Sequence, residues 1–237
     1  MPMRMVFDAT RRFPRRPHYD KIELDRECET IATDLLFRKR GHIEYPLPTE
    51  DLWTLLEEVT DDVDIADLGD LGEEVHGVTL FRRTGRPRVK IERELTLDER
   101  RVNRLRTTLT HEFGHVKFHG FLFALEAETG LLFAEIEKTS RDPICKRDAI
   151  LGNTTDWMEW QAGYVSGAIL MPATAVRETV AATIGTDPTP LPRDDRRVEL
   201  LAYEVRERFG TSADAARTRL TKLGYVAPAA SMVALPT

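Results

Sequence analysis

The stretch "TTLTHEFGHVKFHG", residues 107–120, sets three histidines beside an apolar stripe at helical spacing. Because four residues make about one turn of an α-helix, His111, His115 and His119 project from the same side. The apolar residues of the same helix fall in a separate, adjacent sector, and Glu112 lies between the two sectors. The pattern predicts a helix whose histidines lie beside the core, at the wall of a cleft.

The ends of this helix also carry local signals. Thr96 followed three residues later by Glu99 is a capping-box pattern, which predicts the start of the helix. His119 and Gly120 supply a natural C-terminal stop. We therefore expect the helix to begin after Thr96 and to end at these two residues.

The order His-Glu-x-x-His has a chemical reason. Two neutral imidazoles one turn apart, from His111 and His115, can bind the same tetrahedral Zn²⁺. Glu112 can reach a water bound to that metal, accept its proton as the water attacks a carbonyl, and deliver the proton to the leaving amine. His119 is too close along the same helix to complete the tetrahedron, so we expect it to support a ligand or to end the helix. On this motif alone, a surface helix with incidental histidines remains the alternative.

A catalytic zinc site needs a third protein ligand and one open position. The stretch "TTDWMEWQAGYVSGAILMP", residues 154–172, begins with cap-type residues and continues as an apolar helix. Glu159, near its start, is a charged residue in an otherwise largely apolar helix. It is a candidate ligand, although it can instead close a capping box with Asp156.

Taken in this order, "HEFGHVKFH" and "EWQAGYVSGAILMP" resemble the ImmA/IrrE family of metallopeptidases. The family pattern is HExGHxxxH and then E-x-x-A-N-x-F-A-x-x-L-L-M-P. The resemblance extends over residues 20 to 225, strongly at these two blocks and weakly elsewhere. It implies a zincin-like catalytic domain with one Zn²⁺ per chain, held by His111, His115 and Glu159. It also implies a zinc-dependent endopeptidase in which Glu112 activates the zinc-bound water, with a helix-turn-helix transcriptional repressor as its protein substrate.

The chain departs from the family pattern inside the second block. Gly163, Val165 and Ser166 stand where asparagine, phenylalanine and alanine are usual. These are packing positions rather than ligands, so the departures concern the contacts of the helix and not the metal. Tyr164 is the nearest candidate in sequence for an oxyanion stabiliser or for a group behind the ligands, but it falls about 140° around the helix from Glu159.

Two interpretations from other functional classes stay open. The chain can be a non-catalytic regulatory protein that keeps a structural zinc site and binds a repressor, or a DNA-binding regulator that uses its C-terminal helices. Glu112 favours the enzyme, because a purely structural zinc site has no need of a general base.

The rest of the chain predicts an α+β order of elements. Residues 1–19 are interpreted as a flexible basic arm with five arginines, residues 21–39 as a helix, and a second short helix starts near Thr49. Two β-rich runs flank the turn residues 84–87 and predict a hairpin. We expect residues 20–190 to form the zinc metallopeptidase domain, built from helices and a small antiparallel sheet.

Residues 191–226 predict a helix-turn-helix-like helical module, with a turn at Phe209-Gly210-Thr211 and Ser212 as the cap of the second helix. Acidic side chains dilute the basic residues of that second helix, which are Arg217, Arg219 and Lys222. Protein docking or packing is therefore favoured over DNA binding. Residues 227–237 read as a disordered tail.

The segment between the two motif blocks, residues 120–158, is long and strongly apolar in its first part. It is interpreted most simply as core or as a sheet edge, and alternatively as a wall of a substrate groove. Cys145, within this segment, is interpreted as an inert thiol rather than as a redox-sensitive zinc ligand.

Composition limits the class of protein. The chain of 237 residues is 41% hydrophobic and 31% charged, which is ordinary for a globular protein. Its net charge of −6 argues against a dedicated nucleic-acid binder. The two cysteines form no disulfide framework, and no stretch has the length of a membrane span, so we expect a cytoplasmic protein. Neither composition nor motif determines the oligomeric state.

Overall fold

The computed structural model describes residues 4–72, 74–82, 85–129, 144–145, 156–187 and 189–228. Within these residues the protein is a mixed α+β structure, as the sequence predicts, with eight α-helices and two small sheets. In chain order the elements are β1 (Arg4–Phe7), β2 (Arg15–His18), α1 (Lys21–Arg40), α2 (Thr49–Glu57), β3 (Asp62–Ala66), the 3₁₀ turn η1 (Gly69–Leu71), β4 (Gly77–Leu80), β5 (Arg88–Glu92), α3 (Arg93–Leu97), the 3₁₀ turn η2 (Glu99–Arg101), α4 (Val102–Thr129), β6 (Ile144–Cys145), α6 (Trp157–Leu170), α7 (Ala173–Ile184), α8 (Arg196–Phe209) and α9 (Ala213–Lys222).

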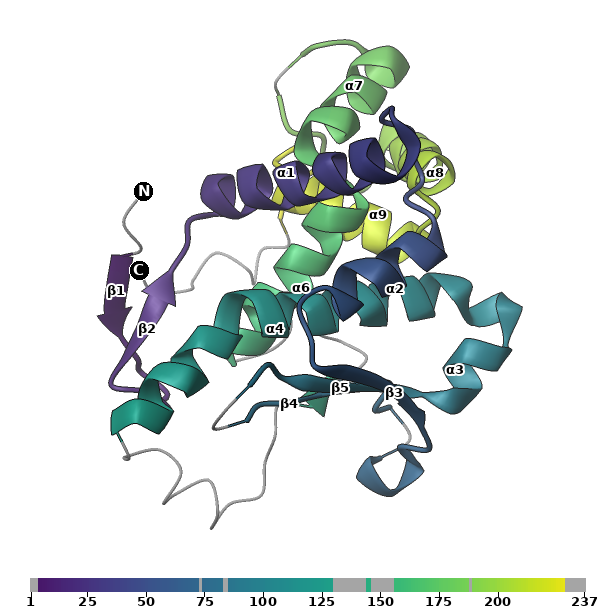
Figure 1. Ribbon diagram of the computed structural model, residues 1–237. Helices are drawn as coiled ribbons and strands as arrows, with labels where there is room; N and C mark the ends of the chain where they lie inside the picture. Colours follow the sequence, from purple (N-terminus) through teal and green to yellow (C-terminus); the bar gives the residue numbers. More distant parts are fainter. Residues whose placement is uncertain are drawn as a thin grey trace.

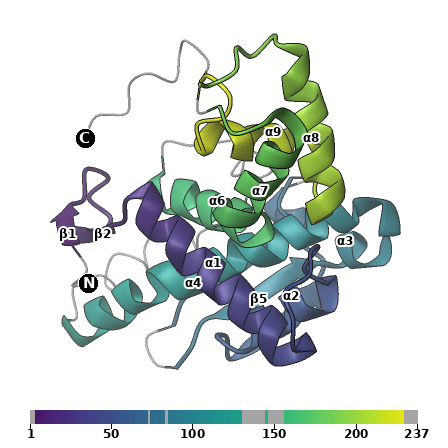
Figure 2. The same ribbon diagram turned by 90° about the horizontal axis from the view of Figure 1, so that it is seen from above.

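The long helix α4 lies at the centre of the arrangement (Figure 1). One side of α4 packs on α6, which in turn packs on α1, and another side faces the four-stranded sheet. Helix α2 also lies against α4, while α7, α8 and α9 gather beside α1 and α6 (Figure 2). This layering places the histidine-bearing helix between the sheet and α6.

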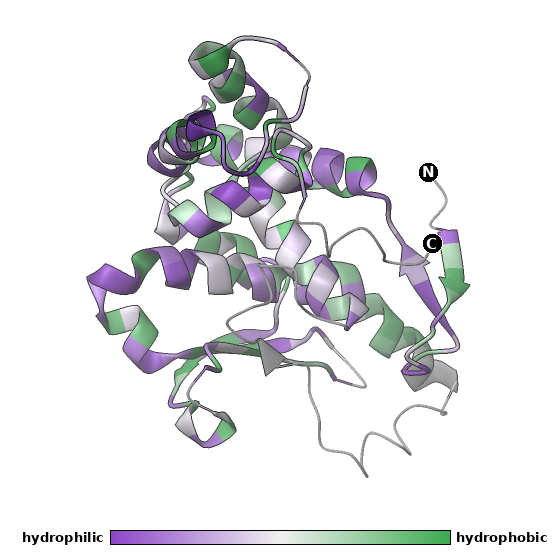
Figure 3. Ribbon diagram, turned by 180° about the vertical axis from the view of Figure 1, so that it is seen from behind, coloured by the Kyte–Doolittle hydropathy of each residue, from purple (hydrophilic) through white to green (hydrophobic). Residues whose placement is uncertain are grey.

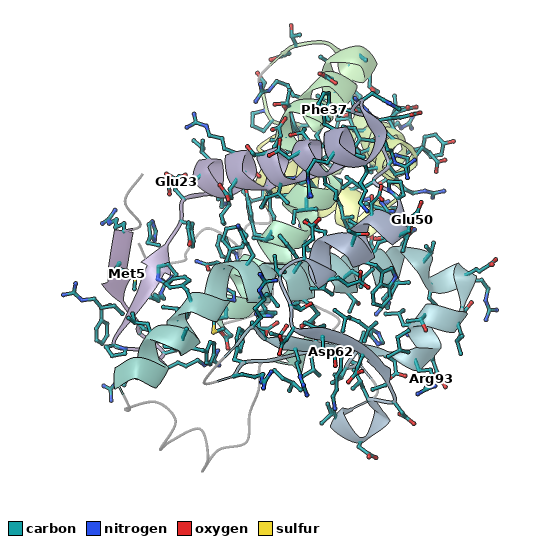
Figure 4. The ribbon with its side chains drawn as sticks, viewed as in Figure 1. Met5, Glu23, Phe37, Glu50, Asp62 and Arg93 are labelled. Atoms are coloured by element: carbon teal, nitrogen blue, oxygen red, sulfur yellow. The ribbon has the colours of Figure 1, made fainter. Side chains whose placement is uncertain are left out.

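The N-terminal segment is not the flexible arm that its composition suggested. Over residues 4–18 it forms a hairpin, in which β1 and β2 pair antiparallel; the first three residues lie outside the described part. Phe13 is 2% exposed and packs edge-on against the rings of Phe123 and Trp157, at centroid distances of 5.1 and 6.3 Å. Met5 joins the same cluster (Figure 4). The arginines suggested a solvated segment, but one buried aromatic side chain anchors it on α4 and α6.

The first two helices agree with the sequence signals. The side chain of Asp20 accepts from the N–H of Glu23, and the carboxylate of Glu23 accepts from the N–H of Asp20, so a full capping box starts α1. The helix ends at Gly41, whose φ of 75° lies in the left-handed region that glycine adopts readily. Helix α2 begins at Thr49, and Pro48 occupies its N-cap position.

The predicted hairpin is confirmed, but the sheet is larger than the sequence indicated. Strands β4 and β5 pair antiparallel, and β3 lies parallel to β5. Strand β6 pairs antiparallel with the other edge of β4, so the order is β3-β5-β4-β6. The sheet is therefore mixed rather than antiparallel. Strand β3 escaped prediction because its sequence, DVDIA, is short and largely exposed, and its pairing depends on a partner far along the chain.

Both ends of α4 differ from the local signals. Thr96 lies inside α3, where its hydroxyl donates to a backbone carbonyl, and the side chain of Asp98 caps the turn η2 that leads into α4. The helix also runs past Gly120 to Thr129. Figure 3 shows that the coloured turns of α4 that follow Gly120 are mostly hydrophobic, and the buried Leu122 and Phe123 pack beside the hairpin. The packing of these side chains outweighs the cost of Gly120 in the helix interior, which is about 1 kcal/mol relative to alanine.

The two C-terminal helices have the local structure that the sequence predicts. Helix α8 ends at Gly210, whose φ is 58°, and Ser212 caps α9 by accepting from the N–H of Ala215. One hydrophobic cluster nevertheless runs through α1, α2, α4, α6, α7, α8 and α9. The expected boundary at residues 190/191 is thus not a boundary of the hydrophobic core.

Two buried arginines tie these helices to the rest of the protein. Arg106 of α4 donates to the carbonyls of Phe209 and Gly210, both at 3.0 Å, and so satisfies the C-terminal end of α8. Arg219 of α9 lies 2.8 Å from the carboxylate of Asp25 in α1. One of the three basic residues of the second helix, Arg219, is therefore inside the protein.

Most of the segment between the two motif blocks lies outside the described residues, as does the tail from residue 229 onward. The interpretations of these parts as core, groove wall or disordered tail therefore fall on residues that the structure does not describe. Among the helices of the described ranges, none is both long enough and apolar enough to cross a membrane.

Candidate metal centre

Helices α4 and α6 cross so closely that the crossing requires a glycine. A Cβ atom at Gly114 would lie 3.0 Å from the Cα and 3.3 Å from the carbonyl oxygen of Ala162. Both are backbone atoms, so they can retreat only if α6 moves. Across the same interface the hydroxyls of Thr110 and Ser166 lie 2.7 Å apart. The glycine of the first motif thus lets α6 approach and brings Glu159 to the histidines.

His111, His115 and Glu159 converge on one point. Nε2 of His111 lies 3.0 Å from Nε2 of His115 and 3.1 Å from Oε2 of Glu159, and Nε2 of His115 lies 3.3 Å from Oε1 of Glu159. Ligand atoms bound at about 2.0–2.1 Å in a tetrahedron are about 3.3–3.4 Å apart, so these separations fit a metal ion at the centre. Among the described residues this is the one group of three or more such side chains that could hold a metal.

The group lies mostly inside the protein, and the expected cleft beside it stays a prediction. His111, His115 and Glu112 are 0% exposed, and the side chain of Glu159 is 14% exposed. The helical spacing separated the histidines from the apolar stripe, but it could not show that α6 covers the histidine side of α4. Buried polar groups need hydrogen-bonding or charged partners, and here His111, His115 and Glu159 are partners of one another.

Glu159 and His115 stabilise each other's charged forms. Burial raises the pKa of Glu159, but the adjacent His115 and His111 outweigh this effect and hold the pKa of that carboxyl well below its ordinary value. Burial lowers the pKa of His115, but Glu159 and Glu112 outweigh it and raise that pKa above its ordinary value. A negatively charged carboxylate facing two imidazole nitrogens is suited to bind a cation.

Glu112 lies beside this group, and its two carboxylate oxygens differ in their contacts. Its Oε2 accepts from the hydroxyl of Thr79 in β4 at 2.6 Å. Its Oε1 is buried and has no hydrogen-bond partner in the described part of the chain, and a Cβ at Gly77 would lie 2.7 Å from it. Burial raises the pKa of Glu112 above its ordinary value. Buried carboxylate oxygens normally have partners, so this oxygen is available as a proton acceptor.

His119 lies behind His115 rather than in the ligand group. The Nδ1 atoms of the two rings are 3.1 Å apart, and Nε2 of His119 lies 3.0 Å from Oε1 of Gln161. Burial lowers the pKa of His119 well below its ordinary value. This position agrees with the expectation that His119 supports a ligand, whereas it does not end the helix.

Tyr164 does not belong to the site, which corrects its candidacy as an oxyanion stabiliser or as a group behind the ligands. Its hydroxyl donates to Asp25 of α1 at 3.0 Å, and its ring faces the guanidinium of Arg219 at 5.6 Å. The helical turn between Glu159 and Tyr164 directs the two side chains to different sides of α6.

Two other sequence alternatives concern Glu159 and Cys145. The side chain of Asp156 caps α6 by accepting from the N–H of Met158 at 2.9 Å, while the carboxylate of Glu159 faces the histidines. The backbone of Cys145 pairs with Gly77 in the sheet, but its side chain lies outside the described part, so its role stays a prediction.

Two residues of the site escaped the sequence analysis. Thr79 lies in an ordinary β-rich run and carries no local signal. Gln161 is 2% exposed and stands two residues after Glu159 in an apolar helix. Because glutamine is mostly found at the surface, a glutamine in such a helix could have marked it.

No protein-family model matches the chain, and no curated protein matches its sequence. The resemblance to the ImmA/IrrE family therefore rests on the two motif blocks.

Proposed function

We propose that the chain is a zinc-dependent endopeptidase that hydrolyses a peptide bond in a specific protein partner. The observation that carries this proposal is the convergent group of His111, His115 and Glu159, next to a Glu112 with a free, buried carboxylate oxygen. Two imidazole nitrogens and one carboxylate oxygen are typical ligands of catalytic zinc, with one position left open. One such group among the described residues supports one ion per chain.

The residues have separate roles in this proposal. His111, His115 and Glu159 would hold the ion, which when bound polarises a carbonyl and lowers the pKa of a coordinated water. Oε1 of Glu112 accepts a proton as water attacks the scissile carbonyl and delivers it to the leaving amine. The hydroxyl of Thr79 occupies the other oxygen of Glu112 and so orients the carboxylate.

The proposed fold is zincin-like, with α8 and α9 as a helix-turn-helix-like module, and the proposed substrate is a helix-turn-helix repressor. These details rest on the resemblance of the two motif blocks. DNA binding by α9 is disfavoured, because Arg219 is 1% exposed and Arg217 pairs with Glu199 and Asp214. A role of these helices in holding or docking protein surfaces is therefore the stronger proposal.

A second candidate function is a regulatory protein with a structural metal site that binds a repressor without cutting it. The observation that favours it is the burial of His111, His115 and Glu112, all 0% exposed. Structural zinc sites are closed, whereas catalytic sites keep one position open. In this alternative the free oxygen of Glu112 has no role.

Two variants separate these functions when the chain is co-expressed with a helix-turn-helix repressor encoded beside it. Glu112→Gln removes a proton acceptor but no ligand, so elemental analysis should still find one zinc per chain while the cleaved repressor fragment disappears. His115→Ala should lose both zinc and cleavage. Full cleavage by Glu112→Gln would refute the peptidase mechanism, and full zinc occupancy in His115→Ala would refute the ligand assignment. Zinc without any cleavage in the wild type would favour the structural alternative.

A further inference from the structure

A line of polar groups connects the N-terminal hairpin to the ligand His115. The carbonyl of Pro17, the side chain of Gln161 and the rings of His119 and His115 follow one another at 3.5, 3.0 and 3.1 Å. Gln161 is 2% exposed, and both histidines are 0% exposed. Because bulk water does not compete for these groups, each hydrogen bond constrains the next.

The direction of the line follows from its first member. The carbonyl of Pro17 can only accept, so the amide nitrogen of Gln161 faces it and Oε1 of Gln161 faces His119. An acceptor at that position requires a hydrogen on Nε2 of His119. A neutral His119 then has a bare Nδ1, which accepts the hydrogen carried by Nδ1 of His115. His115 is left with its lone pair on Nε2, the atom that faces the metal position.

We propose that Gln161 and His119 are positioning residues that hold His115 in the tautomer able to bind the metal. This inference rests on the proposed zinc site. It adds that Gln161 and His119 determine which ring nitrogen of His115 carries the hydrogen. Without the line, either nitrogen of His115 can carry the hydrogen, and the form with hydrogen on Nε2 cannot bind the ion. Outer hydrogen-bond partners of metal-bound histidines contribute about 10–100-fold in metal affinity.

The hairpin that begins the line is held against α6. Arg12 forms an ion pair of 2.7 Å with Asp156, the N-cap residue of α6, and the ring of Phe13 packs on Trp157. The ring of Trp157 in turn meets His119 edge-on, with centroids 5.3 Å apart. The carbonyl that orients the glutamine is therefore anchored to the same helix that carries the third ligand.

A matched pair of variants tests the acceptor at His119. Asparagine and leucine have similar shapes, but asparagine alone offers an oxygen where Nδ1 accepts. Competition with a chromogenic chelator should show zinc affinity about 10–100-fold weaker in His119→Leu and within about threefold of wild type in His119→Asn. Urea unfolding of the metal-free proteins should show that the two variants differ much less in stability than in zinc affinity. A merely structural role of His119 would not produce this contrast. Equal zinc affinity in both variants would overturn the inference.

The tautomers can also be read in the metal-free wild type from the ¹⁵N chemical shifts of its imidazoles, at a pH above the raised pKa of His115, where both rings are neutral. We expect the hydrogen on Nδ1 of His115 and on Nε2 of His119, and a shift of His115 toward its other tautomer in Gln161→Met. A hydrogen on Nε2 of the neutral His115 ring in the wild type would overturn the inference even if the variants failed to fold. If the wild type bound no zinc, the proposed function would fail, and these shifts would still decide the inference.

Discussion

Replacing Gly114 by alanine should disturb the crossing of α4 and α6 and, through it, the metal site. The added Cβ would lie 3.0 Å from the Cα of Ala162. This distance is about 0.5 Å inside an ordinary carbon–carbon contact. Because the obstacle is backbone, α6 has to retreat as a unit, and it carries Glu159 about one turn away. Metal sites tolerate changes of about 0.2 Å in ligand distance, so this retreat is enough to weaken the third ligand.

The expected magnitudes follow from two opposing effects. Overpacking a tight interface costs about 1–3 kcal/mol, while alanine for glycine in a helix interior gains about 0.5–1 kcal/mol. We therefore expect Gly114→Ala to lower the free energy of unfolding by about 1–2 kcal/mol and zinc affinity by at least about tenfold.

Gly120→Ala is the matched control on the same helix. Its Cβ would meet Cγ of Pro87 at 3.6 Å, an ordinary contact, so this variant should be about 0.5–1 kcal/mol more stable than wild type and bind zinc equally well. Urea unfolding of the metal-free proteins measures stability, and chelator competition measures zinc affinity. If Gly114→Ala matched Gly120→Ala in both quantities, the explanation of the glycine in the first motif would be wrong.

Three further substitutions probe contacts outside the crossing. Thr79→Val should keep zinc but slow repressor cleavage about tenfold in the co-expression assay, because Glu112 loses the donor that orients it, whereas Thr79→Ser should retain most of the rate. Arg106→Met should lower the free energy of unfolding in urea by about 2–4 kcal/mol, because the carbonyls that end α8 lose their donor; a loss below about 1 kcal/mol would contradict this role. Burial, together with neighbouring cations, lowers the pKa of Lys222 from 10.5 to about 8. Between these two pH values the unfolded chain therefore binds more protons than the folded chain. The wild type accordingly gains stability as the pH rises from 8 to 10.5. Lys222→Met should therefore be more stable than the wild type below pH 8, and this advantage should shrink toward pH 10.5; an advantage independent of pH would contradict the lowered pKa of Lys222.

Signals confined to a few neighbouring residues were enough to locate much of the fold. Apolar spacing and caps predicted α1, α6, α8 and α9, and turn residues predicted the hairpin of β4 and β5. His111 and His115 needed no tertiary information to be paired, because residues four apart face the same side of any helix that forms. Glu159 was a candidate from its helix alone, and the resemblance selected it among the other carboxylates.

The sequence-based predictions that the structure contradicts share one cause, a contact with a distant part of the chain. Phe13 converts an arginine-rich segment into an anchored hairpin by packing on Phe123 and Trp157. The same cluster carries α4 past Gly120, where local rules end a helix. Tyr164 faces Asp25 because α1 offers a buried acceptor there, which no property of α6 reveals.

The order of amino acids therefore specifies the local helices, the faces of α4 and the candidate metal-binding side chains, since these depend on periodicity and spacing within one element. Folding adds the burial of the histidines, the Glu112 oxygen that has no partner among the described residues, and the hydrogen bonds made by Thr79 and Gln161. Thr79 is 33 residues from Glu112, and Gln161 is 42 residues from His119. Hydrogen bonds over such separations depend on how α4, α6 and β4 pack together, and a periodic pattern within one element carries no information about what covers its face.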